Sequence, residues 1–499
     1  MFDNLLIAAS FIVDPFNFFI IVCGVFLGVI IGALPGLGTA AGVAIMLPVT
    51  LALEPAQAIV MLGAIYAAGT AAGSITSILF RIPGEAQSAM TMLDGFPMAK
   101  RGEAGRALGL AMTASAIGGV VSAIALMFFA PMLAKWALRF GQPEYFALAL
   151  FGLSTVTSLA AKSLVKGIIS TMIGLFLCTV GTSDVFGVER FTFNNDNLRY
   201  GISYIPVIVG IFGMSEFLRN AGTVVVRKLE VAKGDIVKTQ FGVIKEFLQM
   251  KALMFRSIII GVVVGVLPGT GGTTSSVIAY NEAVRWSKHP EKFGTGIDEG
   301  IAAPEFANNS ACGGALVPTL TLGIPGSSTT AVIMAALMSH GLTPGPNLFV
   351  QNKDLVWGVF GGYLMANVLM ILGGLCGIWM FAKILRVPRS ILNWVIFILC
   401  VVGSFGVNSN LQDVWIMFGF GLLGYVMEKY GYPLVPLVLA IILGPIAEAA
   451  LVKGMMVFGS FWPFITRPIS GTLLFLSVLS MFFPLIRNYF EKRKKSKAT

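Results

Sequence analysis

The sequence predicts an all-α, polytopic membrane protein with roughly a dozen transmembrane helices in two related repeats. We expect the repeats to be inverted and to contain broken helices or re-entrant hairpins. Three observations support this fold class. Hydrophobic residues make up 56% of the chain and charged residues only 12%, about half the charged share of a soluble protein. The 58 glycines and 23 prolines suit close helix packing and helix breaks. Finally, a Pro-Gly interruption of apolar segments occurs in both halves of the chain.

The repeat is visible without gaps at its first motif. GVIIGALPGLGT at 28–39 aligns with GVVVGVLPGTGG at 261–272, pairing Pro35 with Pro268 at an offset of 233 residues. Two further matches follow in the same order: YAAGTAAGS (66–74) with FANNSACGG (306–314) at an offset of 240, and IPGEAQSA (82–89) with IPGSSTTA (324–331) at an offset of 242. Three matches in one order, with slowly growing offsets, indicate a duplication.

The repeats divide the chain into four parts. These are a first half (1–218, broken at 28–39 and 66–88), a basic linker (219–251), a second half (252–490, broken at 261–276 and 305–330) and a basic tail (491–499).

In the first half, we expect a first span at 16–34 and a short helix at 39–53 that is capped by Thr39. A small-residue span at 56–80 ends where Pro83 breaks the chain. Asp94-Gly95 is expected to form a turn, and 184–199 an exposed loop. The remaining spans are expected at 107–130, 145–161, 164–183 and 201–218.

The second half repeats the plan. A span at 252–267 leads to Pro268, and Thr273 is expected to cap the next helix, which ends at Arg285. The charged stretch 286–299 is expected to be exposed. Helices at 301–322 and 327–339 flank the second break, and four or five spans follow in 354–490.

The net charge of +10 comes mainly from segments between spans. Positively charged loops lie on the cytoplasmic side of membranes, so we place the linker and the C-terminal tail in the cytoplasm and the N-terminus outside. The tail is interpreted as a juxtamembrane basic segment rather than a nucleic-acid-binding one.

No catalytic residues or cofactors are predicted. The five cysteines lie in apolar surroundings without CxxC spacing, and the two histidines are not part of a metal-ligand pattern. The Gly-x-Gly strings follow apolar helices rather than strands, which excludes a dinucleotide fold. We therefore do not expect an enzyme.

The broken segments are the candidate substrate site. A helix that begins inside the membrane directs unpaired N–H groups and the positive end of its dipole towards whatever precedes it, and so binds anions without a buried Lys or Arg. Hydroxyl and amide groups next to the breaks add hydrogen-bond donors. The predicted substrate-binding residues are Pro35, Gly36, Gly38, Thr39, Arg81, Ser88, Gly269, Gly271, Gly272, Thr273, Thr274, Asn308, Asn309, Ser310, Gly326, Ser327, Ser328 and Thr329.

The same breaks free carbonyl oxygens that suit Na⁺, which we expect as the coupling ion. The candidate Na⁺ ligands are Gly36, Thr70, Thr270, Asn308 and Thr330.

Several alternatives stay open at this point. The breaks are also compatible with simple kinks whose hydroxyls bond to local backbone, and Arg81 with pairing to Glu85. The carboxylates Glu282, Asp298, Glu299 and Glu305 are interpreted as interfacial, with proton carriers as the alternative. An ion channel, or a membrane scaffold or receptor built on the same repeat, are the alternative functions.

The strings GALPGLGTAAGVAIMLPVT (32–50), GVLPGTGGTTSS (265–276) and EFANNSACGG (305–314) resemble the large membrane subunit of the tripartite tricarboxylate transporters, and the resemblance extends over nearly the whole chain. It implies a bacterial inner-membrane, Na⁺-driven importer of carboxylates. It also implies two partners, a small membrane subunit and a periplasmic solute-binding protein, and an elevator-like alternating-access movement.

Overall fold

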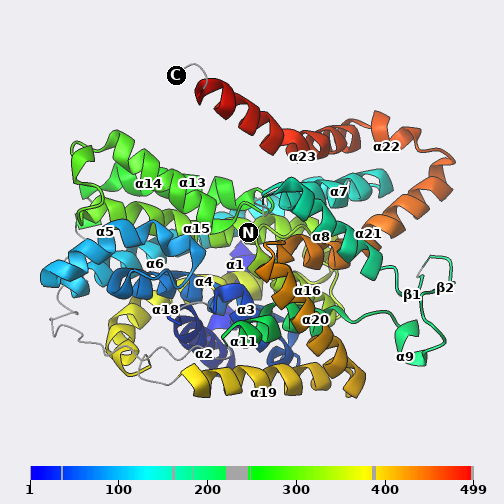
Figure 1. Cartoon of the computed structure of the whole chain (residues 1–499), viewed down its shortest axis with the longest axis horizontal. Coiled ribbons are helices and arrows are strands. Elements are labelled where there is room, and N and C mark those ends of the chain that lie inside the picture. The colour runs from blue at the N-terminus through cyan, green and yellow to red at the C-terminus, as the bar shows by residue number, and fades with distance from the viewer. Residues whose placement is uncertain are drawn as a thin grey trace.

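In the computed structural model the chain is a bundle of helices (Figure 1). The structure describes residues 2–34, 37–159, 163–183, 185–220, 246–247, 249–384 and 389–495. The helices before the linker are α1 (Phe2–Val13), α2 (Pro15–Gly32), α3 (Thr39–Thr50), α4 (Pro55–Phe80), η1 (Ala86–Ala89), α5 (Thr91–Met98), η2 (Ala99–Glu103), α6 (Ala104–Ala137), α7 (Gln142–Leu159), α8 (Leu164–Leu177), α9 (Asp196–Arg199), α10 (Tyr204–Ile208), η3 (Val209–Met214) and α11 (Ser215–Asn220).

Those after the linker are α13 (Lys251–Val266), α14 (Gly271–Trp286), η4 (Pro290–Lys292), α15 (Asp298–Leu322), α16 (Ser328–Ser339), α17 (Pro346–Gln351), α18 (Lys353–Ile384), α19 (Arg389–Asn408), α20 (Leu411–Lys429), α21 (Leu434–Phe458), α22 (Trp462–Thr466) and α23 (Pro468–Lys495). Within the described ranges, five helices are long and apolar enough to cross a membrane, and six shorter apolar helices accompany them. This agrees with the prediction of a helical, polytopic membrane protein.

Local signals explain where the first long helices begin. Asp14 caps α2 by accepting a hydrogen bond from Asn17 N at 2.8 Å, and Pro15 occupies the first turn, where no backbone donor is needed. Glu54 and Gln57 form a capping box at the start of α4. The Gln57 side chain also donates to Asn17 at 2.9 Å, which places the beginnings of α2 and α4 side by side.

Glycines then keep α2 and α4 in close, parallel contact. A Cβ atom on Gly28 would lie 2.7 Å from the carbonyl oxygen of Ile65, and one on Gly32 would lie 2.6 Å from the carbonyl carbon of Gly69. Because α2 ends at this level while α4 continues to Phe80, the described residues on either side of the first break, Ala33 and Leu37, are buried inside the bundle.

Helices α13 and α15 repeat this packing. A Cβ atom on Gly261 would lie 2.9 Å from Ala307 Cα, and one on Gly265 would lie 2.5 Å from the carbonyl oxygen of Ala311. Gly261 and Gly265 correspond to Gly28 and Gly32 at the offset of 233. The residues that they contact, Ile65 and Gly69 in the first half and Ala307 and Ala311 in the second, correspond at an offset of 242 residues. The sequence match for this segment gave an offset of 240. Packing therefore pairs Tyr66 with Asn308, not with Phe306.

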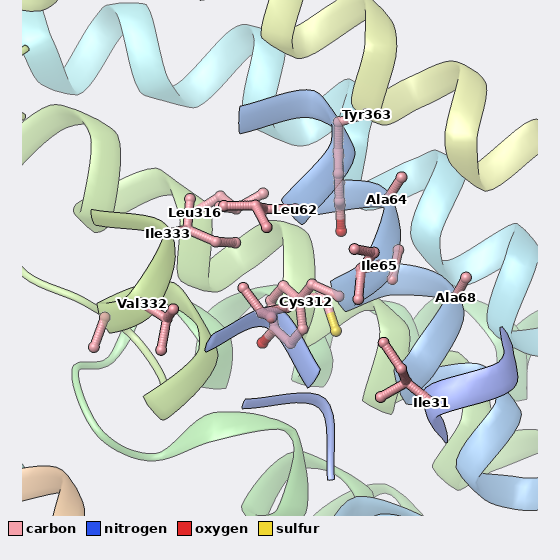
Figure 2. Packing of buried hydrophobic residues seen from close by; sticks show 14 of the residues in the cluster. Ile31, Leu62, Ala64, Ile65, Ala68, Cys312, Leu316, Val332, Ile333 and Tyr363 are labelled. Carbon is pink, nitrogen blue, oxygen red and sulfur yellow. The ribbon is translucent and has the colours of Figure 1, made fainter. Parts of the chain in front are cut away.

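The second breaks are equivalent as well. A Cβ atom on Gly84 would lie 2.6 Å from the carbonyl oxygen of Gly32, and one on Gly326 would lie 2.8 Å from that of Gly265. In each half, the glycine of the Ile-Pro-Gly sequence thus packs against the end of the helix that precedes the first break. Apolar residues of α2, α4, α15, α16 and α18 form the core beside these tips, among them Ile31, Ile65, Leu316, Ile333 and Tyr363 (Figure 2).

Several local predictions were wrong. Gly38, with φ of 64°, is the N-cap of α3, and Thr39 is its first residue. Helix α14 begins at Gly271, before the predicted cap Thr273. After Pro83 there is only a 3₁₀ turn, η1, so this break supplies no long helix start.

Outside the spans, the predicted loop at 184–199 contains strand β2 (Glu189–Arg190), which pairs with β1 (Gly181–Thr182), and the short helix α9. Helix α1 was not predicted. It packs on α18, where Gly361 leaves room for Ala8.

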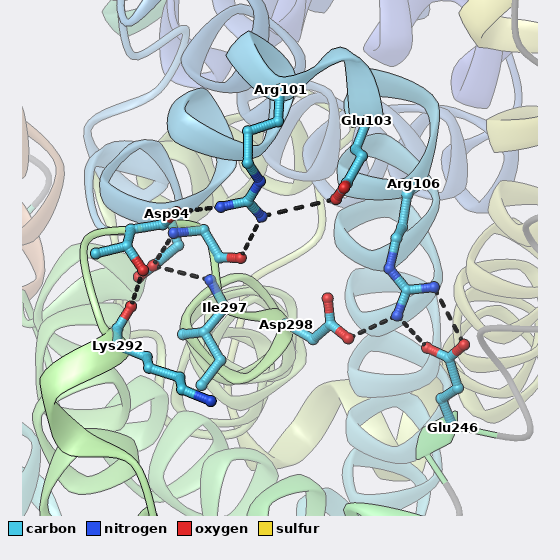
Figure 3. A network of polar contacts seen from close by, with 10 residues as sticks. Asp94, Arg101, Glu103, Arg106, Glu246, Lys292, Ile297 and Asp298 are labelled. Carbon is cyan, nitrogen blue, oxygen red and sulfur yellow. Dashed lines mark hydrogen bonds and ion pairs between the residues drawn. The ribbon is translucent and has the colours of Figure 1, made fainter.

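Asp94-Gly95 is not a turn. Both residues lie in α5, and the Asp94 carboxylate is buried and bonded to the loop before α15 (Figure 3). The Asp-Gly pair wrongly predicted a turn, because Gly95 is there for close helix packing. A Cβ atom on Gly95 would lie 2.5 Å from Ile78 Cγ1. Of the predicted linker, 221–245 lies outside the described residues, as do Pro35, Gly36 and 496–499 of the tail.

Candidate functional site

All four breaks line one cavity of about 470 Å³. Residues 37–41, 85–87, 269–273 and 327–329 form one side of it. Residues of η3, α11, the end of α20 and the start of α21 form the other side. The volume lies in the range of small-molecule sites, about 300–1,000 Å³.

Contacts between the tips are reciprocal in the two halves. Thr39 Oγ1 lies 3.4 Å from Thr329 Oγ1. At the offsets of 233 and 242, Thr39 corresponds to Gly272 and Thr329 to Gln87. Gly272 and Gln87 are also adjacent, since a Cβ atom on Gly272 would lie 2.8 Å from Gln87 Cδ. Each first tip therefore touches the second break of the other half.

Further bonds fix the tips to the long helices. Gly269 N donates to the carbonyl oxygen of Gly326 at 3.1 Å, and the Tyr66 hydroxyl lies 3.1 Å from Ser327 Oγ. Gly269 has a φ of 75°, a conformation that favours glycine. The site is thus held by backbone and by buried side chains rather than by exposed loops.

The three helix starts that follow the breaks, those of α3, α14 and α16, are not equivalent. At α3, the backbone N–H of Thr39 already donates to the carboxylate of Glu85. At α16, Ser327 and Thr330 form a capping box that uses the N–H groups of both residues. The N-cap of α14, Thr270, makes no side-chain cap bond. Its hydroxyl donates instead to the carbonyl oxygens of Val264 and Leu267.

Of the helix starts that follow the breaks, that of α14 is therefore the best placed to bind an anion. Gly271, Gly272 and Thr273 line the cavity there, and without a side-chain cap their N–H groups remain available to an anion. Ser328 and Thr329 of α16 line the same cavity and add donors.

Most of the charged side chains lie on the opposite wall, whereas Glu85 lies on the side of the breaks. Arg219 lines the cavity and pairs with Glu216 and, at 2.9 Å, with Glu428. Ser215 and Tyr432 complete this wall. Because Arg219 is already paired with two carboxylates and Glu85 caps α3, the uncapped start of α14 is the source of positive potential that the breaks offer to an anion.

Other predicted substrate residues lie away from the cavity. Arg81 is the exposed C-cap of α4, and its guanidinium lies over the Phe96 ring. Ser88 is buried and bonds to Ser77 Oγ at 2.8 Å and to the carbonyl oxygen of Gly73 at 3.0 Å. Thr274 is exposed and does not line the cavity.

In α15, Asn309 donates to Met370 Sδ at 3.8 Å, and Ser310 donates to the carbonyl oxygens of Gly118 and Phe306. Ser88 and Ser310 have the structural role that was left open as the alternative.

The predicted Na⁺ ligands are also dispersed. The Thr70 hydroxyl accepts a hydrogen bond from Cys312 Sγ at 3.5 Å, and Thr330 belongs to the capping box of α16. Asn308 is different, because its buried amide oxygen has no hydrogen-bond donor among the described residues.

Glu85, Gln87 and Arg219 line the cavity but were not among the predicted site residues. Glu85 and Gln87 follow a proline break, where charged and polar residues usually lie at the membrane interface. Arg219 opens the basic linker and was counted with it. In each case the only sequence signal was proximity to a break or a span end, which does not specify a direction for the side chain.

Replacing Glu85 with alanine is expected to destabilise the tip moderately. The carboxylate accepts from the first N–H of α3 and faces the positive end of that helix, an arrangement worth about 1 kcal/mol. Thermal unfolding of the purified protein checks this. Glu103→Ala is the control, because Glu103 forms only an exposed ion pair with Arg101. Equal transition temperatures for the two variants would contradict the capping role.

Comparisons with known proteins give matches over most of the chain. Residues 18–439 match the family described as "Tripartite tricarboxylate transporter TctA family". An Agrobacterium vitis protein described as an uncharacterized 52.8 kDa protein in the TAR-I ttuC′ 3′ region is 36% identical over 496 residues, covering 99% of this chain and 98% of that protein. A second A. vitis protein, from the TAR-II ttuC′ 3′ region and also uncharacterized, is 36% identical over 234 residues, covering 47% of this chain and 97% of that protein. No solved structure matches.

Proposed function

This chain belongs to the TctA family, the large membrane subunit of tripartite tricarboxylate transporters, and on that premise we propose that it imports citrate-like carboxylates with the energy of an ion gradient, which we take to be Na⁺. It is a multi-pass membrane protein and a transporter subunit, not an enzyme. In this proposal a periplasmic solute-binding protein delivers the substrate, and a small membrane subunit completes the complex in the bacterial inner membrane.

The observation that carries the proposal is the convergence of four chain breaks on one cavity. In a membrane, non-helical backbone is tolerated where it lines a cavity, and paired breaks indicate a transporter's binding site. One carboxylate of the substrate would bind the N–H groups of Gly271, Gly272 and Thr273 together with the Thr273 hydroxyl, and another the hydroxyls of Ser328 and Thr329.

Alternating access requires two states of the same site, which an inverted repeat supplies. Supporting this, Asp94 of α5, whose neighbour Gly95 packs against Ile78 near the end of α4, bonds to Gly294, Gly296 and Ile297, just before α15. The end of α4 and the beginning of α15 therefore share a face, which supports two repeats that run in opposite directions. An elevator-like movement of the tips past the α11–α20–α21 wall would then expose the cavity to either side.

The orientation follows from the charges. Lys100, Arg101 and Arg106 lie on the face where α4 ends and α15 begins, and Arg106 pairs with Glu246 at the far end of the linker. By the positive-inside rule we assign this face, with the linker and the C-terminus, to the cytoplasm.

The test compares two adjacent threonines. Thr273→Val is expected to lower substrate affinity about tenfold or more, because it removes a donor to a charged group at the uncapped helix start. Thr274→Val is the matched control, since Thr274 is exposed but does not line the cavity. The measurement is uptake of labelled citrate and other carboxylates by cells that also express the two partner subunits, with and without a Na⁺ gradient.

Saturable, Na⁺-dependent uptake that weakens only in Thr273→Val would support both function and site. Failure of the correctly inserted complex to take up any carboxylate would overturn the substrate class. Flux that never saturates would favour a channel instead.

A further inference from the structure

Two buried amide oxygens face one glycine at the edge of the cavity. Gln87 is 9% exposed and Asn308 0%. The position that a Cβ atom of Gly272 would take lies 1.7 Å from Gln87 Oε1 and 2.8 Å from Asn308 Oδ1. The two oxygens are therefore at most 4.5 Å apart, the sum of these distances. Neither has a hydrogen-bond donor among the described residues.

Buried acceptors without a donor are rare and unfavourable, so two that face one point indicate a ligand between them. A hard cation fits this geometry. Such cations take oxygen ligands at about 2.3–2.6 Å, which allows two ligands to be up to roughly 5 Å apart. An anion does not fit between these two oxygens, because both are acceptors; Asn308 Nδ2, which also has no hydrogen-bond partner among the described residues, is the one buried donor of this pair of groups without a partner.

A buried carboxyl group lies one helical turn away. Glu305 is 0% exposed, which contradicts its prediction as an interfacial residue. Its carboxylate oxygens accept hydrogen bonds from Thr91 and Ser115, each at 2.5 Å. Among the residues that the structure describes, no Lys or Arg pairs with it. A buried carboxylate without a cationic partner is costly, and a bound monovalent cation next to it would offset that cost.

We propose that Gln87 Oε1 and Asn308 Oδ1 bind the coupling Na⁺ behind Gly272, with Glu305 as its counter-charge. This assignment rests on the proposed function for the identity of the ion. It replaces Thr70, Thr270 and Thr330 as ligands, and it brings the two halves together at the ion, since Gln87 belongs to one and Asn308 to the other.

The position explains how ion and substrate are coupled. Gly272 lines the anion cavity on one side and contacts both amides on the other. A cation there adds positive potential at the uncapped start of α14, where the substrate carboxylate binds. Each ligand therefore raises the affinity for the other. The bound cation also explains how the cavity attracts a multiply charged anion, although its single arginine among the described residues is already paired.

The test measures ion binding without transport. The purified full-length protein is heated in detergent at increasing NaCl, with choline chloride keeping ionic strength constant. Binding to the folded state raises the transition temperature. Even the loss of a residue that only hydrogen-bonds to a metal ligand lowers metal affinity about 10- to 100-fold. We therefore expect Asn308→Ala and Gln87→Ala each to require at least about tenfold more Na⁺ to reach half of the maximal stabilisation.

Controls separate ion binding from packing. Asn367→Ala and Gln57→Ala remove buried amides of the same types away from the cavity, and should keep the wild-type Na⁺ dependence. Glu305→Gln preserves shape and should abolish the Na⁺ response. If Asn308→Ala does not fold, Gln87→Ala and Glu305→Gln still decide the result.

The outcomes distinguish the site from the transport function. Na⁺ stabilisation lost in the site variants, in a complex that takes up no carboxylate, would support the ion site and overturn the importer. Na⁺-driven uptake whose Na⁺ dependence is unchanged in Gln87→Ala and Glu305→Gln would overturn the ion site and leave the importer standing. A wild-type protein stabilised by protons but indifferent to Na⁺ would also overturn it.

Discussion

Gly32→Ala is expected to abolish uptake and to leave little folded protein. The added Cβ atom would overlap the carbonyl oxygen of Gly69 and lie 2.6 Å from its carbonyl carbon. Both atoms belong to the backbone of α4, which cannot yield as a flexible side chain can. Overpacking ordinarily costs about 1–3 kcal/mol, and we expect the upper end or more here.

The effect should reach the site, because Gly32 is the last residue of α2 and its carbonyl oxygen packs against Gly84. Separating α2 from α4 would move both breaks of the first half together. Yield, size-exclusion profile and thermal unfolding of the purified protein are the measurements.

Gly63→Ala is the matched control on α4. Its Cβ atom would lie 3.4 Å from Tyr363 Cδ2, an ordinary contact, and alanine is favoured over glycine within helices by about 1 kcal/mol. This variant should therefore be as stable as the wild type or more so. A Gly32→Ala protein with wild-type yield and transition temperature would show that α2 and α4 do not pack through these glycines.

The repeat and its breaks were predictable because a Pro-Gly pair inside an apolar segment interrupts a helix wherever the segment lies in the fold. The register within the long helices was not. In α4 and α15, small residues follow one another so closely that a shift by two still produces plausible matches, as with Tyr66 and Phe306. Only the packing of Gly28 and Gly261 on their neighbours fixes the offset at 242.

The sequence predicted which chain segments form the site, but not which of their side chains face the cavity. All four breaks line the cavity, yet the division of work among them depends on contacts that no local pattern encodes. Glu85 caps α3 across 46 residues of sequence, and Thr91 and Ser115 reach Glu305 from 190 or more residues away. Sequence analysis identified hydroxyls beside the breaks, whereas the structure separates those that face the cavity from those that bond to neighbouring backbone.

Asp94→Ala is expected to be the most destabilising polar substitution outside the cavity. Asp94 Oδ1 accepts from the backbone N–H groups of Gly294, Gly296 and Ile297 at 2.8–3.1 Å. Oδ2 accepts from the Tyr280 hydroxyl at 2.8 Å. One buried carboxylate thus organises the loop that joins α14 to α15 (Figure 3).

Removing the carboxylate leaves these donors without their acceptor. Each buried donor that loses its partner costs about 1–3 kcal/mol, so the loss should reach at least about 3 kcal/mol, because four bonds disappear together. Asp94→Asn retains one carbonyl oxygen and should fall between alanine and the wild type.

The measurement is thermal unfolding, with Glu103→Gln as control. Glu103 pairs with Arg101 on the same face, but both side chains are 47% exposed, and such pairs contribute at most about 1 kcal/mol. The expected order of transition temperatures is therefore wild type, Glu103→Gln, Asp94→Asn and Asp94→Ala. Since the loop sets where α15 begins, Asp94→Ala should also weaken transport by displacing Asn308 and Glu305 along that helix. If Asp94→Ala had the same transition temperature as Glu103→Gln, the loop would be held by other contacts. The position of α15 would then not depend on this carboxylate.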